Sequence, residues 1–259
     1  MDQQSVLALF DEQMRRNVHP DDPAVRIERV GDVVRLVGAD AEDWNAVLWS
    51  GLDDATADAA IAAQVDHFTS LGREFEWKLY THDQPADLSG RLRAAGFSPE
   101  PAETLMVAEI ETLGVDAELP DGVRLQPVTD ASGVDLAVDV HEQAFGANGD
   151  RLRHRLLSQL GSGPETFSVT VAMAGDTPVC AARMELNVGT DFAGLWGGGT
   201  VPAWRGRGIY RALVSHRARL AAELGYRYLQ VDASDQSRPI LQRLGFAALS
   251  TTVPYVFQP

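Results

Sequence analysis

Cysteine and long apolar runs are scarce in this chain of 259 residues. Cys180 is the only cysteine, so no disulfide can form within the chain, and its apolar neighbours suggest a small core residue. The sequence has no run of about 18 apolar residues, which argues against a transmembrane helix. Acidic rather than basic residues precede the first apolar stretch, unlike in a secretory signal peptide. We therefore expect a cytoplasmic protein that does not act on a membrane.

Positive charge is scarce as well. The formal net charge is −15, which argues against a general nucleic-acid-binding protein. Residues 1–120 carry 24 acidic and 9 basic side chains, whereas residues 121–259 carry 13 of each. This change in composition coincides with a turn-rich stretch at residues 118–122 and predicts two domains, residues 1–118 and 119–259. The acidic half either attracts a cationic substrate or partner or only keeps the chain soluble.

Several familiar site motifs are missing. No group of His and Cys residues has the spacing of a metal site, so we expect no metal. The chain has no G-x-S-x-G motif of a serine hydrolase. It has no P-loop, which needs Gly-Lys followed by Ser or Thr, and the dinucleotide fingerprint fails because Arg211 stands where its third glycine belongs.

A glycine- and arginine-rich loop in the second half is the most informative stretch. Residues 200–213 read TVPAWRGRGIYRAL, which predicts a strand end, a loop at 205–208 and an amphipathic helix that ends at Gly225. The helix is expected to bury Ile209, Ala212, Leu213, His216, Leu220 and Leu224, with Arg211, Ser215, Arg217, Arg219 and Glu223 between them.

The same loop predicts an anion site. The first turn of a helix has unpaired N–H groups and partial positive charge, and glycine lets an anion approach the backbone. Arg205, Arg207 and Arg211 add full charges, and residues 192–222 contain no Asp or Glu. We expect a diphosphate-like group here; the alternative is a solvated Arg-Gly turn before an ordinary helix.

The loop resembles the signature of GNAT-type acetyltransferases, Q/R-x-x-G-x-G/A, which cradles the pyrophosphate of acetyl-coenzyme A. Arg205 and Gly208 match it, Pro202 also fits, and Tyr210 departs from the last position, where Gly or Ala is usual. The predicted element order of residues 121–259 is that of the whole family fold: strand, two helices, three strands, helix, strand, helix and two strands. The resemblance implies acetyl-CoA as co-substrate, bound by Gly199, Thr200, Val201, Arg205, Gly206, Arg207, Gly208, Ile209, Tyr210 and Ser234.

An internal repeat extends the resemblance to the first half. The segments FEWKLYTHDQPADLSGRLRAAGF and YLQVDASDQSRPILQRLGF both predict a strand, a polar turn with Asp-Gln, a short helix and Gly-Phe. Coincidence between two ordinary strand–helix–strand pieces is the alternative. Where the second half has its Arg-Gly loop, the first has SGLDD at 50–54, and carboxylates there would repel a pyrophosphate. The fold class predicted is therefore α/β (α+β): two GNAT-like domains, each a mixed, mostly antiparallel sheet flanked by helices, with a degenerate N-terminal copy.

The resemblance also implies the chemistry, in which an amine attacks the acetyl thioester directly. This reaction needs a neutral amine, an oxyanion donor and a proton for the departing thiolate. The donor is expected among the strand N–H groups of residues 198–201. The tyrosine that protonates the thiolate in many members is replaced here by Leu241, so Tyr255 or water would substitute.

Candidate bases are Glu185 and Asp232, since each ends an apolar strand, although a strand-end residue facing water is the simpler interpretation of either. His141 could reach a substrate pocket, but a lone helical His is more often exposed or satisfied in the core. The function predicted is acetyl transfer to a primary amine of a small molecule or peptide. The alternative is a coenzyme-A-binding sensory or regulatory module without catalysis. The sequence indicates neither the acceptor nor the oligomeric state.

Overall fold

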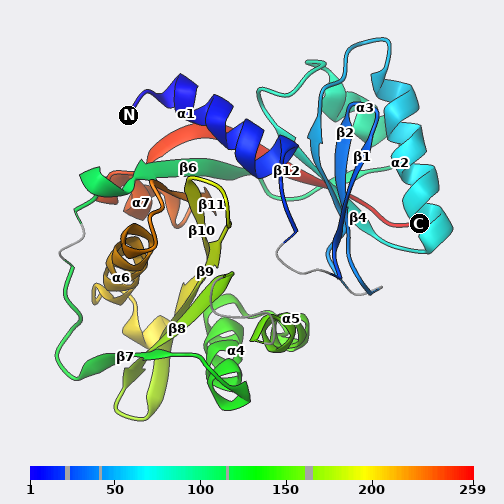
Figure 1. Cartoon of the computed structure of the whole chain (residues 1–259). Coiled ribbons are helices and arrows are strands. Elements are labelled where there is room, and N and C mark those ends of the chain that lie inside the picture. Colours follow the sequence, from blue (N-terminus) through cyan, green and yellow to red (C-terminus); the bar gives the residue numbers. More distant parts are fainter. Residues whose placement is uncertain (21–23, 41–42, 115–116, 161–165) are drawn as a thin grey trace. The chain divides into compact units, whose positions relative to one another are not determined.

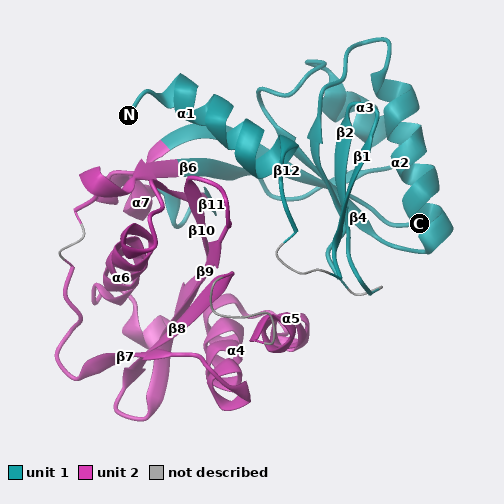
Figure 2. Cartoon of the chain, viewed as in Figure 1, with its two compact units in different colours: residues 1–106, 232–238, 248–259 teal, residues 107–231, 239–247 magenta. Residues whose placement is uncertain are grey.

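The computed structural model describes residues 1–20, 24–40, 43–114, 117–160 and 166–259. The chain forms two compact units (Figure 1, Figure 2). Unit 1 comprises residues 1–106, 232–238 and 248–259, and unit 2 comprises residues 107–231 and 239–247. A single cut near residue 118 does not separate them, because the last strand of the chain belongs to unit 1 together with the N-terminal half.

Unit 1 is built on a mixed sheet. Its elements are α1 (Gln3–Phe10), η1 (Asp11–Arg16), β1 (Arg26–Val30), β2 (Val33–Val37), β3 (Ala46–Ser50), α2 (Ala57–Leu71), β4 (Phe75–Tyr80), α3 (Leu88–Ala94), β5 (Ser98–Pro99), the first half of β6 (Glu103–Glu109) and most of β12 (Ala247–Phe257). The strand order is β1-β2-β3-β4-β12, with β5 also paired to β12. Only the β3–β4 pair is parallel among these ladders.

The core of unit 1 is aromatic. Phe68 of α2 stacks on Phe75 of β4 at 4.3 Å between ring centroids, and Trp77 and Tyr255 are buried beside them. Alternate strand residues share one face of a sheet, so Phe75 and Trp77 face α2 and α3 while Glu76 and Lys78 face the other way.

Unit 2 is likewise built on mixed strand pairing. Its elements are η2 (Ile110–Thr112), β7 (Val123–Pro127), α4 (Ala131–Phe145), α5 (Asp150–Leu160), β8 (Phe167–Ala174), β9 (Thr177–Leu186), β10 (Phe192–Thr200), η3 (Pro202–Trp204), α6 (Ile209–Glu223), most of β11 (Tyr228–Ala233) and α7 (Arg238–Leu244). The strand order is β11-β10-β9-β8-β7. The β10–β11 pair is parallel and the others are antiparallel, so the predicted mixed, mostly antiparallel fold class is confirmed.

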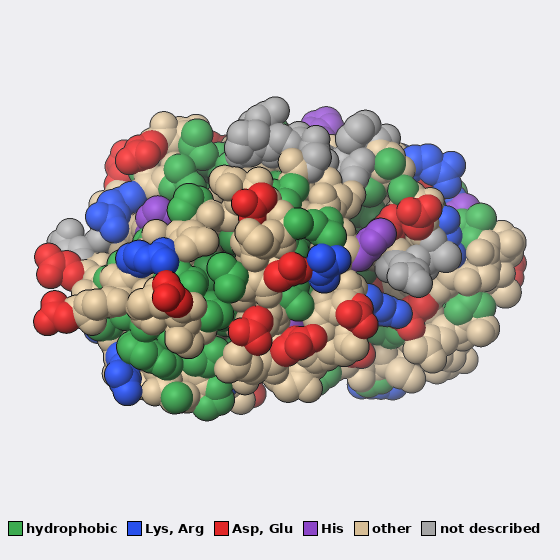
Figure 3. All heavy atoms as spheres, turned by 90° about the horizontal axis from the view of Figure 1, so that it is seen from below, with side chains coloured by type: hydrophobic (Ala, Val, Ile, Leu, Met, Phe, Trp, Pro, Cys, Tyr) green, Lys and Arg blue, Asp and Glu red, His purple; other side chains and the backbone are tan. Residues whose placement is uncertain are grey.

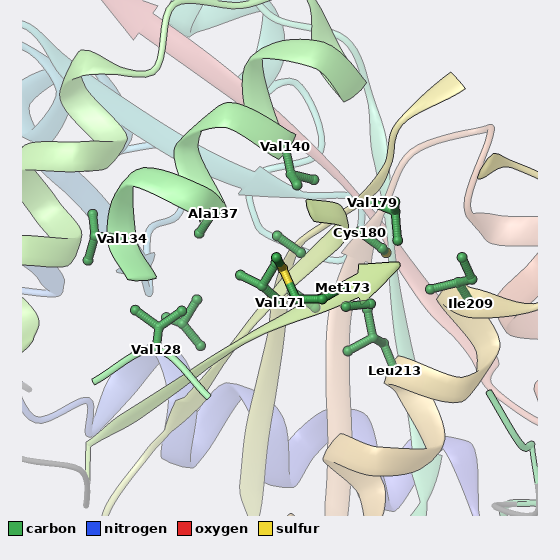
Figure 4. Close-up of a cluster of buried hydrophobic side chains, with 14 of the residues drawn as sticks. Val128, Val134, Ala137, Val140, Val171, Met173, Val179, Cys180, Ile209 and Leu213 are labelled. Carbon is green, nitrogen blue, oxygen red and sulfur yellow. The ribbon is translucent and has the colours of Figure 1, made fainter. Parts of the chain in front are cut away.

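Helices cover both faces of the unit 2 sheet. Figure 4 shows apolar side chains of α4, among them Val134 and Val140, on one side of the strands, and Ile209 and Leu213 of α6 on the other. Asp130 caps the start of α4 through a 2.8 Å hydrogen bond from Gly133 N–H, and Gly146 ends it in the left-handed conformation. These caps determine where α4 begins and ends.

The predicted buried stripe of α6 is partly wrong. Arg217 is 2 % exposed and Ser215 is also buried, whereas Leu224 is 54 % exposed and His216 is half-buried. Arg217 is buried because its guanidinium hydrogen-bonds to the backbone carbonyls of Leu213 and Arg183, which hydropathy spacing does not encode. The two last strands predicted for the chain are also one strand, β12.

The two halves share the local structure of the predicted repeat. Helices α2 and α6 each have 15 residues. After α3 and after α7, Gly96 and Gly245 take φ values of +98° and +104°. The N–H of the following Phe97 or Phe246 then donates to a carbonyl of the helix at 3.1 Å in both cases. Matching helix ends of this kind are expected of two copies of one fold.

The surface carries mixed charge. On the face shown in Figure 3, Lys and Arg side chains are scattered singly among Asp, Glu and hydrophobic side chains. No helix among the described residues is both long and apolar enough to cross a bilayer.

Candidate functional site

The strands β10 and β11 part in the middle of unit 2. Their parallel ladder joins residues 192–194 to residues 228–230, but β10 continues to Thr200 and β11 to Ala233. On its other edge β10 stays paired with β9, apart from an irregularity between Trp196 and Gly199. Beyond Gly194, β10 therefore has an edge toward β11 on which an extended ligand can form strand-like hydrogen bonds.

Consecutive glycines let two aromatic rings approach this strand. A Cβ on Gly198 would lie 2.7 Å from Cε2 of Tyr210 in α6, and a Cβ on Gly199 would lie 2.7 Å from Cε2 of Phe145 in α4. The glycine-rich end of β10 is thus explained by close packing from both faces. Tyr210, which departs from the usual small residue of the loop signature, is accommodated because Gly198 has no side chain.

The Arg-Gly loop leads from β10 into the first turn of α6. Gly206 and Gly208 have φ values of +76° and +83°, a conformation that favours glycine. A Cβ built on either residue meets nothing within 4 Å, so the space above the loop is open to a ligand. Gly208 is the N-cap of α6 and makes no side-chain cap, which leaves the helix N-terminus available to an anion.

The arginines of the loop have different environments. Arg205 donates to the carbonyl oxygens of Thr200 at 3.1 Å and Ala144 at 2.8 Å, so it ties the loop to the end of α4. The Arg207 guanidinium lies 4.4 Å from the Trp204 ring centroid. Arg211 is exposed on α6. Arg207 and Arg211 are therefore available to bind an anion, while Arg205 stabilises the conformation of the loop.

A group of charged side chains lies on the α4 and α5 side of the unit 2 sheet. Glu185 of β9 accepts a 2.9 Å hydrogen bond from Arg155 of α5 and lies 3.6 Å from Arg183 Nη2. Burial lowers the pKa of His141, and the charge of Arg183 lowers it further. At neutral pH His141 is thus an uncharged imidazole, one helical turn before Phe145.

The other predicted site residues lie in unit 1. Asp232 is 2 % exposed and forms an ion pair with Lys78 of β4. Tyr255 is 3 % exposed in the aromatic core, with Arg93 over its ring at 5.4 Å. Ser234 is exposed and lies 3.3 Å from the Ser237 hydroxyl. Glu185 and the predicted residues from Gly199 to Tyr210 thus belong to unit 2, whereas Asp232, Ser234 and Tyr255 belong to unit 1.

Sequence reasoning missed two ionisable residues near Asp232, Glu103 and Glu76. Burial raises the pKa of Glu103 in β6 to about 7, and the charge of Asp232 raises it further while Lys78 opposes this. Burial also raises the pKa of Glu76. The only signal in the sequence was that Glu103 stands at the start of an apolar strand, and a charged residue at that position usually faces solvent. Among the described residues, no three His, Cys, Asp or Glu side chains are grouped so as to hold a metal ion.

Comparison with known proteins identifies the domain. The acetyltransferase (GNAT) family matches residues 135–246, so the predicted resemblance is confirmed. The matched segment is a GNAT acetyltransferase domain, and this supports an acyltransferase enzyme. GNAT proteins use acetyl-CoA and transfer acyl groups. No curated protein sequence matches the chain.

Solved structures match over nearly the whole chain. A GCN5-related N-acetyltransferase from Kribbella flavida has a TM-score of 0.70 at 18% identity, covering 99% of this chain and 94% of its own. A functionally unknown conserved protein from Staphylococcus epidermidis has a TM-score of 0.68 at 14% identity, covering 94% and 96%. A tandem GNAT protein from the clavulanic acid biosynthesis pathway has a TM-score of 0.61 at 16% identity, covering 93% and 85%. At these identities the likeness concerns the fold.

Proposed function

We propose that this enzyme transfers an acetyl group from acetyl-CoA to a primary amine of a small molecule or peptide. The observation that carries the proposal is the parting of β10 and β11 beyond Gly194, next to a helix N-terminus formed by Gly206 and Gly208. A strand edge suits the amide-containing arm of the coenzyme, and the open glycine loop suits its pyrophosphate.

Different residues would bind different parts of the coenzyme. The backbone N–H groups of residues 206–210, with Arg207 and Arg211, would hold the pyrophosphate. Gly199, Thr200 and Val201 would face the coenzyme arm, and a strand N–H among residues 198–201 would stabilise the oxyanion. When bound, acetyl-CoA would supply the thioester. The protein would orient it, accept a proton from the amine and provide one for the departing thiolate.

A proton must leave the attacking amine. Glu185 could accept it only by weakening its ion pair with Arg155, and Asp232 only by weakening its ion pair with Lys78. His141 is neutral at neutral pH because burial lowers its pKa, and it lies on the same side of the sheet as Gly199, against which the adjacent Phe145 packs. We therefore add His141 to Glu185 and Asp232 as a candidate base.

The N-terminal half is proposed to be a degenerate copy that binds no coenzyme. At the start of α2, the carboxylate Oδ1 of Asp53 accepts hydrogen bonds from Ala55 N–H at 3.0 Å and from Thr56 N–H at 2.9 Å. The carboxylate thus occupies the place that an anion takes at the start of α6. A calorimetric titration should find one acetyl-CoA site per chain; two sites would contradict the degenerate copy.

One observation favours the alternative, a coenzyme-A-binding module without catalysis. Leu241, at the place of the usual tyrosine acid, is fully buried, and Tyr255 is buried in the core of unit 1. Neither offers a proton to a thiolate without rearrangement, so water would have to protonate it.

The two functions differ in one assay. The full chain is incubated with acetyl-CoA and a broad panel of primary amines, and free thiol and acetylated amine are measured together. Amine-dependent release of both products supports the transferase. Tight coenzyme binding without release above hydrolysis for any amine would contradict it and favour the binding module.

A further inference from the structure

Positive charge gathers around β9 and β10 in a chain whose net charge is −15. On the α4 side, Arg155 and Arg183 lie beside Glu185, and on the α6 side Arg217 donates to the backbone carbonyl of Arg183. Arg217 is 2 % exposed, and its Nη1 and Nε donate to backbone carbonyls. A buried cation without a full counter-charge is costly, and backbone carbonyls compensate part of this cost at Arg217.

Arg183 of β9 lacks a full set of partners. Its side chain is 12 % exposed, and its Nε is buried without a hydrogen-bond partner among the described residues. Its nearest carboxylate oxygen, on Glu185, lies 3.6 Å from Nη2, which is too long for a good hydrogen bond. Burial lowers the pKa of Arg183 to about 10, which reflects the same lack of compensation.

The register places Arg183 at the irregular part of β10. Arg183 pairs with Trp196 and Ala181 pairs with Gly199. Alternate residues of β9 share a face, so Arg183 lies on the same face as the Cβ of Ala181 and next to the residues proposed to hold the oxyanion. Gly199, the partner of Ala181, packs against Phe145 of α4, so Arg183 lies on the α4 side, where its charge lowers the pKa of His141.

We propose that Arg183 binds a carboxylate carried by one of the two substrates, and so selects for it. This inference rests on the proposed function. A guanidinium presents paired N–H donors that match a carboxylate, and the unpaired Nε gives this site an unused donor. The carboxylate can belong to the acceptor, as in an amino-acid-like amine, or to the acyl chain, as in a dicarboxylic acyl-CoA.

Two arms of one experiment distinguish these sources. In the acceptor arm, acetyl transfer by the full chain is measured for amino acids, their methyl esters and their decarboxylated amines. In the acyl arm, succinyl-CoA and butyryl-CoA are titrated calorimetrically, which needs no turnover. Each arm compares the wild type with Arg183→Met and Arg183→Lys, and with Arg124→Met as a control, since Arg124 is exposed on β7.

One arm should show a preference of about tenfold to hundredfold for the carboxylate-bearing ligand, as expected for a charge-assisted pair. Arg183→Met should remove the preference, Arg183→Lys should keep part of it, and Arg124→Met should leave it unchanged. Equal use of both ligand types in both arms would overturn the inference. If no amine is acetylated, the proposed function fails, while the titration arm still tests Arg183.

Thermal unfolding separates this role from a structural one. If Arg183 is kept for a ligand, Arg183→Met should unfold at the same or a higher temperature than the wild type without ligand, because a poorly compensated buried charge is removed. A large fall in the unfolding temperature, together with unchanged ligand preference, would show that Arg183 serves the fold alone.

Discussion

Replacing Gly208 by Asp should abolish coenzyme binding and leave the fold intact. Gly208 has a φ of +83°, so any side chain there costs about 1–2 kcal/mol of stability. A Cβ meets no atom within 4 Å, so no steric clash adds to this. A carboxylate near the start of α6 also interacts favourably with the helix dipole, by about 0.3–1 kcal/mol. The unfolding temperature should therefore change by only a few degrees.

The loss of binding follows from charge. A carboxylate about 5 Å from a pyrophosphate with two negative charges, at an effective dielectric constant of about 40, raises the binding free energy by about 3 kcal/mol. This corresponds to a loss of affinity of more than about 100-fold. The carboxylate also occupies the helix N–H groups that the phosphate would use.

Gly208→Asn is the matched control, because Asn has nearly the same shape and backbone cost but no charge. Titrations of acetyl-CoA at low ionic strength should give a gap of about 100-fold between the Asn and Asp variants. The gap should narrow in about 1 M salt, where the Debye length falls to about 3 Å. Equal affinities for the two variants would refute the placement of the pyrophosphate at this loop.

Three further predictions concern stability. Arg15→Met should lower the free energy of unfolding by about 3–5 kcal/mol, measured in urea, because Arg15 binds both oxygens of Asp83, which is 5 % exposed. The pKa of Glu103 is raised to about 7, so the folded state keeps a proton that the unfolded state loses near pH 4.5, and stability falls as the pH rises between these values. Glu103→Gln should thus be neutral at pH 5 and stabilising by about 2 kcal/mol at pH 8, after allowance for partial exposure. Gly198→Ala should destabilise by about 1–3 kcal/mol through its contact with Tyr210, and Tyr210→Ala should remove most of that cost in a double-mutant cycle.

For each of these three stability predictions, one result would contradict it. Arg16 is 57 % exposed beside Glu12, so Arg16→Met should cost less than about 1 kcal/mol; equal losses at Arg15 and Arg16 would contradict the buried pair. A Glu103→Gln effect that does not vary with pH would rule out the raised pKa. Additive costs at Gly198 and Tyr210 would mean that the two do not touch.

Much of the fold could be predicted because local signals agree with the tertiary structure. The strand at residues 75–80 and the helices at 131–145 and 150–160 follow local sequence patterns. Period-2 or period-3.6 patterns and helix caps determine them. The glycine loop was equally readable, since positive φ at two positions requires residues that the sequence displays.

The parts of the fold and site that could not be predicted depend on contacts between residues distant in the sequence. Local patterns cannot show that β12 belongs to unit 1, because strand pairing across the chain decides this. Arg217 looked like a surface residue, and its burial depends in part on the carbonyl of the distant Arg183. The raised pKa of Glu103 likewise arises from burial beside Asp232, which is 129 positions away in the sequence.

Hydrogen–deuterium exchange of the full chain with and without acetyl-CoA tests the central claim most directly. The account predicts that the coenzyme protects the backbone amides of residues 197–210, where β10 leaves β11 and the glycine loop enters α6. The amides at the start of α2, already bonded to Asp53, should not change. Protection at the start of α2, or no protection at residues 197–210, would contradict it.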